Sequence, residues 1–389
     1  MAAQDMYPLV AIDPVANAQN EWVALRLRLR AEAGADGEAG LLALFGRPDL
    51  LAAIAPLDGL LVLENLAALT PQVVALLPAN RIGLVIGAAA LGQQHAARLA
   101  ELHAAGYRIW LDGDIPSDIT PPQALRCVAR DCRVDAPPLG RLVALFGPHL
   151  AHGVDSARRF TECEIAGFDW FCGDYPYDPL SAPRPDDDGS SRRRIMTLLG
   201  LLARDADSHD LEQQIKQDPA LSYHLLKLVN SAAFAVSAQI TSFAQAIAVL
   251  GRRQLQRWLQ LLLYARAQPD GLPNLLLPLA ARRAAQVEAL CRLHGGAREA
   301  QDLAFMAGVF SLLDRLLRMP MDDIARELQL PPDVAAALVH RGGQLGSWLR
   351  LVEGEPDIGN LTAAGVTAHD WWRSQLAAYH WAIQVGRNV

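Results

Sequence analysis

Over the first half of the chain, short runs of apolar residues alternate with stretches in which apolar residues recur at the spacing of a helix. Such runs, when they are rich in branched and aromatic side chains, are typical of buried strands. Between them, residues 91–105 place Leu91, Leu99 and Leu102 on one face of a helix, and Gly106 is suited to end it. Alternating strands and helices predict a parallel sheet with crossovers, of which a (β/α) barrel is one form. We expect strands at 60–63, 82–86, 108–111, 132–134, 150–154 and 170–172.

Helical spacing dominates the second half, where strand patterns are almost absent. Asp218 and Pro219 suit the N-cap and the first position of a helix, and apolar side chains follow them on one face. The pattern predicts an all-α bundle, with helices over 219–229, 246–250, 255–263, 279–293, 303–317, 321–328 and 332–339.

A polar segment rich in proline, serine and charged residues separates these two patterns. We expect an α/β domain at 1–180, a linker at 181–194 and an all-α domain at 195–389. Each domain is long enough to bury a core of its own.

Composition narrows the class of protein. Of the 389 residues, 51% are hydrophobic and 20% are charged, which is typical of a globular chain. A net charge of -7 argues against nucleic-acid binding, which uses a basic surface. No apolar run approaches the ~20 residues that cross a bilayer, and the N-terminal residues lack the pattern of a signal peptide. The 5 cysteines include no C-x-x-C pair, which indicates reduced thiols in a cytoplasmic protein.

The region 106–179 carries an ordered set of strand ends and turns. It reads GYRIWLDGD, then CRVD, then AHGVDS, and it continues through a helix to Gly167, Asp169, Gly173 and Pro179. This order resembles the EAL family of cyclic di-GMP phosphodiesterases. The resemblance implies a shortened (β/α) barrel whose ligand site lies at the carboxyl ends of its strands.

In that family, acidic side chains hold divalent cations that activate water and neutralise phosphate charge. The resemblance places Ala24, Val85, Gly113 and His152 at acidic positions. A structural role is favoured for His152 over binding of a softer metal, because no second His or Cys stands at a partnering place. We therefore expect a degenerate domain that is not an enzyme and holds no catalytic residue, metal or cofactor. The polar residues at its other degenerate positions are Asp112, Arg133, Asp135 and Asp155.

Two segments of the second half resemble the HDOD family, the HD-related output domains. They read DPALSYHLLKLVNSAAF at 218–234 and ITSFAQAIAVLG at 240–251. The two His-Asp dipeptides of this half are interpreted as helix caps or surface pairs. Together the two halves resemble the YuxH-like EAL–HDOD signal transduction proteins, with a degenerate EAL domain followed by an α-helical HDOD bundle.

Three functions stay open at this point. The favoured one is a non-catalytic signalling protein, in which the degenerate EAL module is coupled to an HDOD domain that binds a signalling protein. The alternative is a cyclic di-GMP receptor that binds without hydrolysis through Arg28 and Arg133. Binding is expected to be weak or absent, because each charge-assisted contact contributes only ~1.5–3 kcal/mol. A residual phosphodiesterase ranks third, because the acidic positions are lost.

The adjacent Trp371 and Trp372 are the candidate partner-binding residues. Neighbouring side chains on a helix diverge by about 100°, so one buried face does not readily hold both. We expect one of the two to face a partner or another part of the chain. Trp258 and Trp348 are further candidates for exposure, although core burial is favoured for Trp258. The identity of the partner stays open, as does the oligomeric state, with a homodimer as the commonest assembly.

Overall fold

The computed structural model describes residues 7, 9–30, 37–88, 91–92, 95–114, 127–133, 147–179, 197–198, 200–201, 207–216, 252–264 and 272–388. By its internal contacts the chain divides into two compact units. The first comprises Met1–Ser181 with Pro356–Ile358, and the second comprises Ala182–Glu355 with Gly359–Val389.

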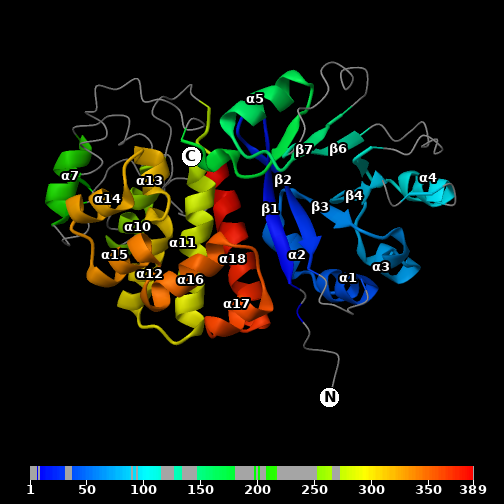
Figure 1. Cartoon of the computed structure of the whole chain (residues 1–389). Coiled ribbons are helices and arrows are strands. Elements are labelled where there is room, and N and C mark those ends of the chain that lie inside the picture. Colours follow the sequence, from blue (N-terminus) through cyan, green and yellow to red (C-terminus); the bar gives the residue numbers. More distant parts are fainter. Residues whose placement is uncertain are drawn as a thin grey trace, which may run out of the picture. The chain divides into compact units, whose positions relative to one another are not determined.

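The first unit contains a closed barrel of eight strands that follow one another in sequence order (Figure 1). β1 runs antiparallel to its two neighbours, β2 and β8, and the other neighbouring pairs are parallel. This topology confirms the barrel that the alternating pattern predicted. The strands are β1 Val10–Asn17, β2 Trp22–Leu29, β3 Asp58–Leu63, β4 Ile82–Gly87, β5 Ile109–Asp112, β6 Cys127–Asp131, β7 Leu150–His152 and β8 Trp170–Cys172.

Three strands differ from the sequence prediction. β1 and β2 precede the first predicted strand, and β2 was missed because its alternate positions carry Arg26 and Arg28 rather than apolar side chains. Of the strand predicted at 132–134, residues 132 and 133 lie after the end of β6 at Asp131, and residue 134 lies outside the described residues.

Helices connect the strands of the first unit on the outside of the barrel (Figure 1). α4 confirms the helix predicted at 91–105, although it begins at Ala96. Gly106 follows it with a φ of 94°, a left-handed conformation that favours glycine at a helix end. The helices are α1 Gly37–Phe45, α2 Asp49–Ile54, η1 Leu66–Ala68, α3 Pro71–Leu76, α4 Ala96–Ala104, α5 Ala157–Ile165 and η5 Tyr175–Tyr177.

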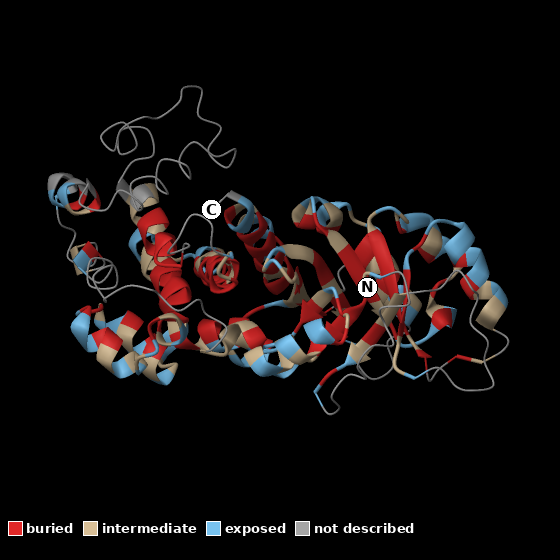
Figure 2. Ribbon diagram, turned by 90° about the horizontal axis from the view of Figure 1, so that it is seen from above, coloured by how far each residue is buried: buried red, intermediate tan, exposed pale blue. Residues whose placement is uncertain are grey.

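One residue from each strand enters a single buried cluster inside the barrel. Because side chains alternate along a strand, residues two positions away on the same strand face the same interior. Trp110 fills much of this space, stacks on Trp170 with ring centroids 5.5 Å apart, and donates its indole N–H to the carbonyl of Pro148 over 2.8 Å. Figure 2 shows the buried residues running along the strands. The cluster comprises Val15, Ala24, Leu60, Val85, Trp110, Ala129, Leu150 and Cys172.

The described part of the second unit consists of helices and contains no strand, as the sequence pattern predicted. α11 is buried over most of its length and packs against α12, α16 and α18. The helices are α7 Ser208–Lys216, α10 Arg252–Leu262, α11 Leu276–Leu293, α12 Arg298–Phe310, α13 Leu313–Leu317, α14 Met321–Glu327, α15 Pro332–His340, α16 Gly343–Glu353, α17 Ile358–Ala363 and α18 Ala368–Asn388.

Most of the predicted helices of this unit are present, with differences at their ends. The single helix predicted at 303–317 is divided into α12 and α13, and the Ser311 hydroxyl donates to the Gly308 carbonyl over 2.8 Å where α12 ends. α16 and α17 were not predicted, and for α18 a helix was assumed only around Trp371 and Trp372. The helices predicted at 219–229 and 246–250, with the segments 218–234 and 240–251, lie outside the described residues. Among the helices that are described, none combines the length and the apolarity needed to cross a bilayer.

Candidate functional site

Charged side chains gather inside the first unit at the carboxyl ends of its parallel strands. Asp112 on β5, Asp131 on β6 and His152 on β7 each end their strand. Each lies two positions beyond a member of the buried cluster, and therefore faces the same interior. In a parallel barrel this end carries the ligand-binding groups.

β1 and β2 bring further charges to the same end. Arg26 and Arg28 lie two and four positions beyond Ala24 on β2, so they share its inward face. β1 is antiparallel, and its Asp13 lies directly opposite Arg26 in the register. We call the whole set the barrel-end cluster: Asp13, Arg26, Arg28, Asp112, Asp131, Arg133 and His152.

Asp112 and His152 form one pair of this cluster. Nε2 of His152 lies 2.9 Å from Oδ1 and 2.8 Å from Oδ2 of Asp112. β6 separates the two strands and presents the small side chain of Ala129 at the level of Asp112, so the pair can meet inside the barrel. His152 is only 8% exposed. A carboxylate that holds one ring nitrogen fixes the imidazole, and the imidazole can then exchange a proton at its other nitrogen.

Asp13 is shared by two guanidinium groups. Its Oδ2 accepts from Nε of Arg28 over 3.0 Å and lies 3.7 Å from Nη1 of Arg26. The side chain of Arg26 is 11% exposed, and its Nε is buried without a hydrogen-bond partner among the described residues. One carboxylate thus faces two positive charges in a nearly closed part of the barrel.

Cys172 adds no negative charge to this corner. Burial raises the pKa of its thiol to about 12, and the carboxylate of Asp13 acts in the same direction. The positive charges of Arg26 and Arg28 lower it only in part. At neutral pH the thiol is therefore protonated, and it is a poor metal ligand because metals bind the thiolate.

Asp131 and Arg133 form the third pair. Nε of Arg133 donates to Oδ1 and Oδ2 of Asp131 over 3.0 and 3.1 Å. These hydrogen bonds lower the pKa of the Asp131 carboxyl to about 2, with a smaller contribution from His152. Asp131 raises the pKa of the Arg133 guanidinium. The positive charge of Arg28 has a smaller effect in the opposite direction. Arg28 and Arg133, the two residues expected to contact a ligand, thus lie at the same end of the barrel.

The barrel-end cluster does not fit a divalent cation. Each of its three carboxylates already lies against a guanidinium or an imidazole. Three arginines balance the three aspartates of the cluster. Mg²⁺ and Mn²⁺ require several oxygen ligands directed at one point. Within the described ranges, no group of three or more His, Cys, Asp or Glu side chains is placed to hold a metal ion.

Two of the predicted degenerate positions lie deeper than expected. Ala24 and Val85 are fully buried in the cluster inside the barrel. On β2 the positions near the strand end are Arg26 and Arg28. Sequence reasoning missed Arg26, Asp13 and Asp131 as site residues. The regular alternation of leucine and arginine in WVALRLRL is the signal that would have indicated a strand with charged residues on one face.

Three further predicted positions, Gly113, Asp155 and Asp135, do not belong to the barrel-end cluster. Gly113 follows β5 with a φ of 95°, in open space, so a turn that favours glycine accounts for it. Asp155 is exposed and accepts a hydrogen bond from the Ser156 hydroxyl over 2.9 Å. Asp135 lies outside the described residues.

The tryptophans proposed as candidates for exposure are buried. Trp371 and Trp372 are 3% and 5% exposed, Trp348 is 5% exposed, and Trp258 is buried as favoured. The reason lies in α18, whose buried positions extend over roughly 200° of its circumference at 100° per residue. So wide a buried face holds both neighbouring tryptophans.

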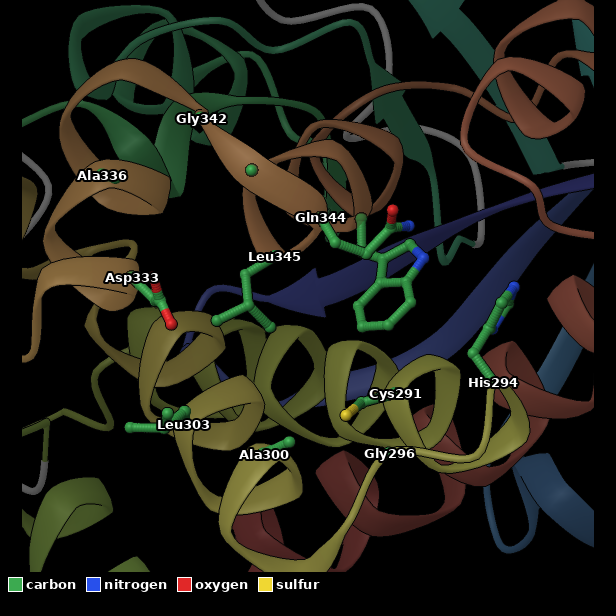
Figure 3. A pocket seen from close by; sticks show the side chains of 12 residues that line it. Cys291, His294, Gly296, Ala300, Leu303, Asp333, Ala336, Gly342, Gln344 and Leu345 are labelled. Atoms are coloured by element: carbon green, nitrogen blue, oxygen red, sulfur yellow. The ribbon is translucent and has the colours of Figure 1, made fainter.

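The second unit contains a cavity of about 380 Å³ between α11, α12, α15 and α16. Its wall is largely apolar, with the thiol of Cys291 and the carboxylate of Asp333 among its polar groups. Figure 3 shows Asp333 and His294 at opposite sides of the cavity. The His294 ring packs against Trp348 with centroids 5.2 Å apart, and its two nitrogens each lie 2.8 Å from a backbone carbonyl. The cavity is concave and apolar enough to accept a small apolar group.

Residues 191–317 match the HDOD domain family. This match confirms the HDOD domain that the sequence segments indicated. The barrel precedes the matched residues, and α14 to α18 follow them.

Two curated relatives align over about half of the chain. The cyclic di-GMP phosphodiesterase CdgJ of Vibrio cholerae is 30% identical over 207 residues, which are 52% of this chain and 47% of CdgJ. The uncharacterized protein YuxH of Bacillus subtilis is 27% identical over 206 residues, 52% of this chain and 50% of YuxH. The chain therefore spans about half the length of the curated relatives it matches. A solved standalone EAL protein from Vibrio cholerae O395, with cyclic di-GMP bound, is 14% identical over 43% of this chain and 90% of its own, at a TM-score of 0.32.

The relative CdgJ corrects one expectation. The loss of acidic positions led us to expect that the chain is not an enzyme. CdgJ is named a phosphodiesterase and is similar to half of this chain, which contradicts that expectation.

Proposed function

We propose that this chain acts in cyclic di-GMP signalling and that its barrel-end cluster binds a phosphodiester group of that nucleotide. The observation that carries the proposal is that Arg28 on β2, His152 at the end of β7 and Arg133 after β6 all lie at the same end of the barrel. The HDOD domain and the similarity to CdgJ support a role in this signalling system.

Guanidinium groups suit this ligand. A guanidinium carries five N–H donors in a planar fork that matches two phosphate oxygens. Arg133 uses Nε and one terminal nitrogen for Asp131, so its ion pair fixes the fork. The sequence alone led us to expect weak binding through two arginines. Arg26 and His152 raise the number of cationic or hydrogen-bonding groups, and each charge-assisted bond contributes ~1.5–3 kcal/mol.

Calorimetric titration with cyclic di-GMP tests this proposal. We expect saturable binding that weakens about tenfold in Arg28→Gln and in Arg133→Gln, which corresponds to ~1.4 kcal/mol for each. Arg108→Gln is the matched control, because Arg108 pairs with Asp58 at the opposite end of the same barrel. The same samples are assayed for the linear dinucleotide, which measures turnover directly. An absence of binding, or equal losses in all three variants, would refute the proposal.

We further propose that the helical unit binds a signalling protein, with its cavity as the receptor for an apolar side chain. The apolar wall formed by Ala300 and Leu303 favours this role. Ala300→Phe should fill the cavity and reduce capture of protein partners from cell extracts. Glu299→Phe places the same ring on the exposed surface of α12 and should leave capture unchanged. Equal capture by both variants would exclude the cavity.

A further inference from the structure

From the barrel-end cluster we infer that this chain binds the phosphodiester directly on guanidinium groups and needs no divalent cation to do so. The inference rests on the proposed function and concerns how the same site neutralises phosphate charge. Arg26 is its central residue, a side chain that sequence reasoning did not single out.

The carboxylates of the cluster are not arranged to collect a cation. Asp112 lies against His152, Asp131 against Arg133, and Asp13 against both arginines of β2. A divalent cation would have to displace a cationic or imidazole partner from each carboxylate that it used. At Asp112 or Asp13 the released His152 or Arg26 would stand in a largely buried place without its partner, which is costly.

The corner formed by Asp13, Arg26 and Arg28 has the opposite requirement. Arg26 and Arg28 both lie against the carboxylate of Asp13 there, and the thiol of Cys172 beside them stays protonated. Nε of Arg26 is buried with no hydrogen-bond partner among the described residues. A buried cation with an unmade hydrogen bond is stabilised by an anion that can accept it. The corner therefore favours an anion over a cation.

A phosphodiester meets this requirement. Its two unesterified oxygens carry one negative charge and can accept from adjacent donors of a guanidinium fork. Asp13 stays in place and orients the two side chains of β2, while Arg133 is oriented by Asp131. The guanidinium groups thereby supply the charge neutralisation that bound cations provide in a metal-dependent phosphodiester site.

The test is calorimetric titration of the full chain with cyclic di-GMP in EDTA, and again with Mg²⁺ or Mn²⁺ in excess. We expect the two dissociation constants to agree within about twofold. We expect Arg26→Gln to weaken binding about tenfold under both conditions. Arg26→Lys, which keeps the charge but loses the planar fork, should also weaken binding. Arg108→Gln should bind as the wild type does, and circular dichroism shows whether each variant is folded.

The outcomes separate this inference from the proposed function. Binding that appears only with Mg²⁺ or Mn²⁺, or that is abolished by EDTA, would overturn the inference and leave the proposed function standing. Binding that is equally strong in folded Arg26→Gln and in the wild type would also overturn it. Absence of binding under every condition would overturn both. Because the comparison with EDTA uses the wild-type chain, it decides the matter even if the variants fail to fold.

Discussion

At the scale of single residues, function depends on pairs that the chain brings together from distant segments. Asp112 and His152 are forty positions apart in sequence, and Asp13 meets two arginines of the next strand. Sequence reasoning identified Asp112, His152, Arg28 and Arg133 individually but could not pair them. Pairing follows from strand register and from which face of each strand is inward, and neither is visible in an isolated polar residue.

Removal of the Arg133 side chain should raise the pKa of the Asp131 carboxyl to its usual value. In the wild type the pKa of this carboxyl lies at about 2, below its usual value of 3.8, because Arg133 donates to the charged form. The depressed pKa contributes stability that is present above about pH 4 and lost as the pH falls toward 2. In Arg133→Gln we expect the pKa to rise toward 3.8. Carbon-13 NMR titration of the Asp131 carboxyl measures it, and an unchanged pKa would contradict the assignment.

Asp112 and His152 should be energetically coupled. Removal of one partner leaves the other polar group buried, which costs about 1–3 kcal/mol. We therefore expect His152→Ala and Asp112→Ala each to destabilise the barrel at neutral pH. The double variant should lose less than the sum of the two, with a coupling of roughly 0.5–3 kcal/mol. Urea denaturation of the four proteins measures this cycle. Strict additivity would show that the contact contributes nothing to stability.

At the scale of elements, apolar strands and amphipathic helices were predictable and charged strands were not. β3, β4, β5, β7 and β8 coincide with predicted segments to within a few residues. β2 was not predicted because its charged residues face the inside of the barrel, whereas polar residues of a strand usually face outward. α16 and α17 escaped because no sequence signal was assigned to them, and the burial of Trp371 and Trp372 depends on the wide packed face of α18.

Each tryptophan of the α18 pair should be a core residue. Trp371→Ala and Trp372→Ala both remove a large buried side chain, and such changes cost about 3–5 kcal/mol. We expect both variants to lower the melting temperature of the helical unit, measured by circular dichroism. A variant that melts like the wild type would indicate that its tryptophan is not packed in the core.

Gly308 should be required for the close approach of α11 and α12. A Cβ at this position would lie 2.4 Å from Cα and 2.6 Å from the backbone nitrogen of Ala284, and the backbone of α11 cannot move aside cheaply. Gly308→Ala should therefore destabilise the helical unit by roughly 1–3 kcal/mol, although alanine favours helices. Gly386→Ala in α18 is the control, because its nearest contact is an ordinary 3.4 Å from Pro278. Calorimetric melting compares them, and equal stabilities would contradict the close packing.

At the scale of the whole molecule, the sequence predicted a barrel followed by helices, and the structure has both. The HDOD segments were identifiable because they are long and ordered. The interpretation of the barrel was less successful. Sequence reasoning assigned Ala24 to an acidic position and did not single out Arg26. The count of lost acidic positions led to the expectation of no enzymatic activity, which CdgJ contradicts. The loss of acidic residues was visible in the sequence, as were Arg28 and Arg133, whereas the place of Arg26 on the inward face became evident only in the closed barrel.

The central claim is that guanidinium groups at the barrel end contact the phosphodiester of cyclic di-GMP. NMR of the arginine Nε–H groups during titration with cyclic di-GMP in EDTA tests it most directly. We predict shifts for Arg26, Arg28 and Arg133, because a phosphate oxygen would change the hydrogen bonding of each group. The signal of Arg108, at the opposite end of the barrel, should stay in place. Unchanged signals for all three barrel-end arginines at saturating nucleotide would contradict the account.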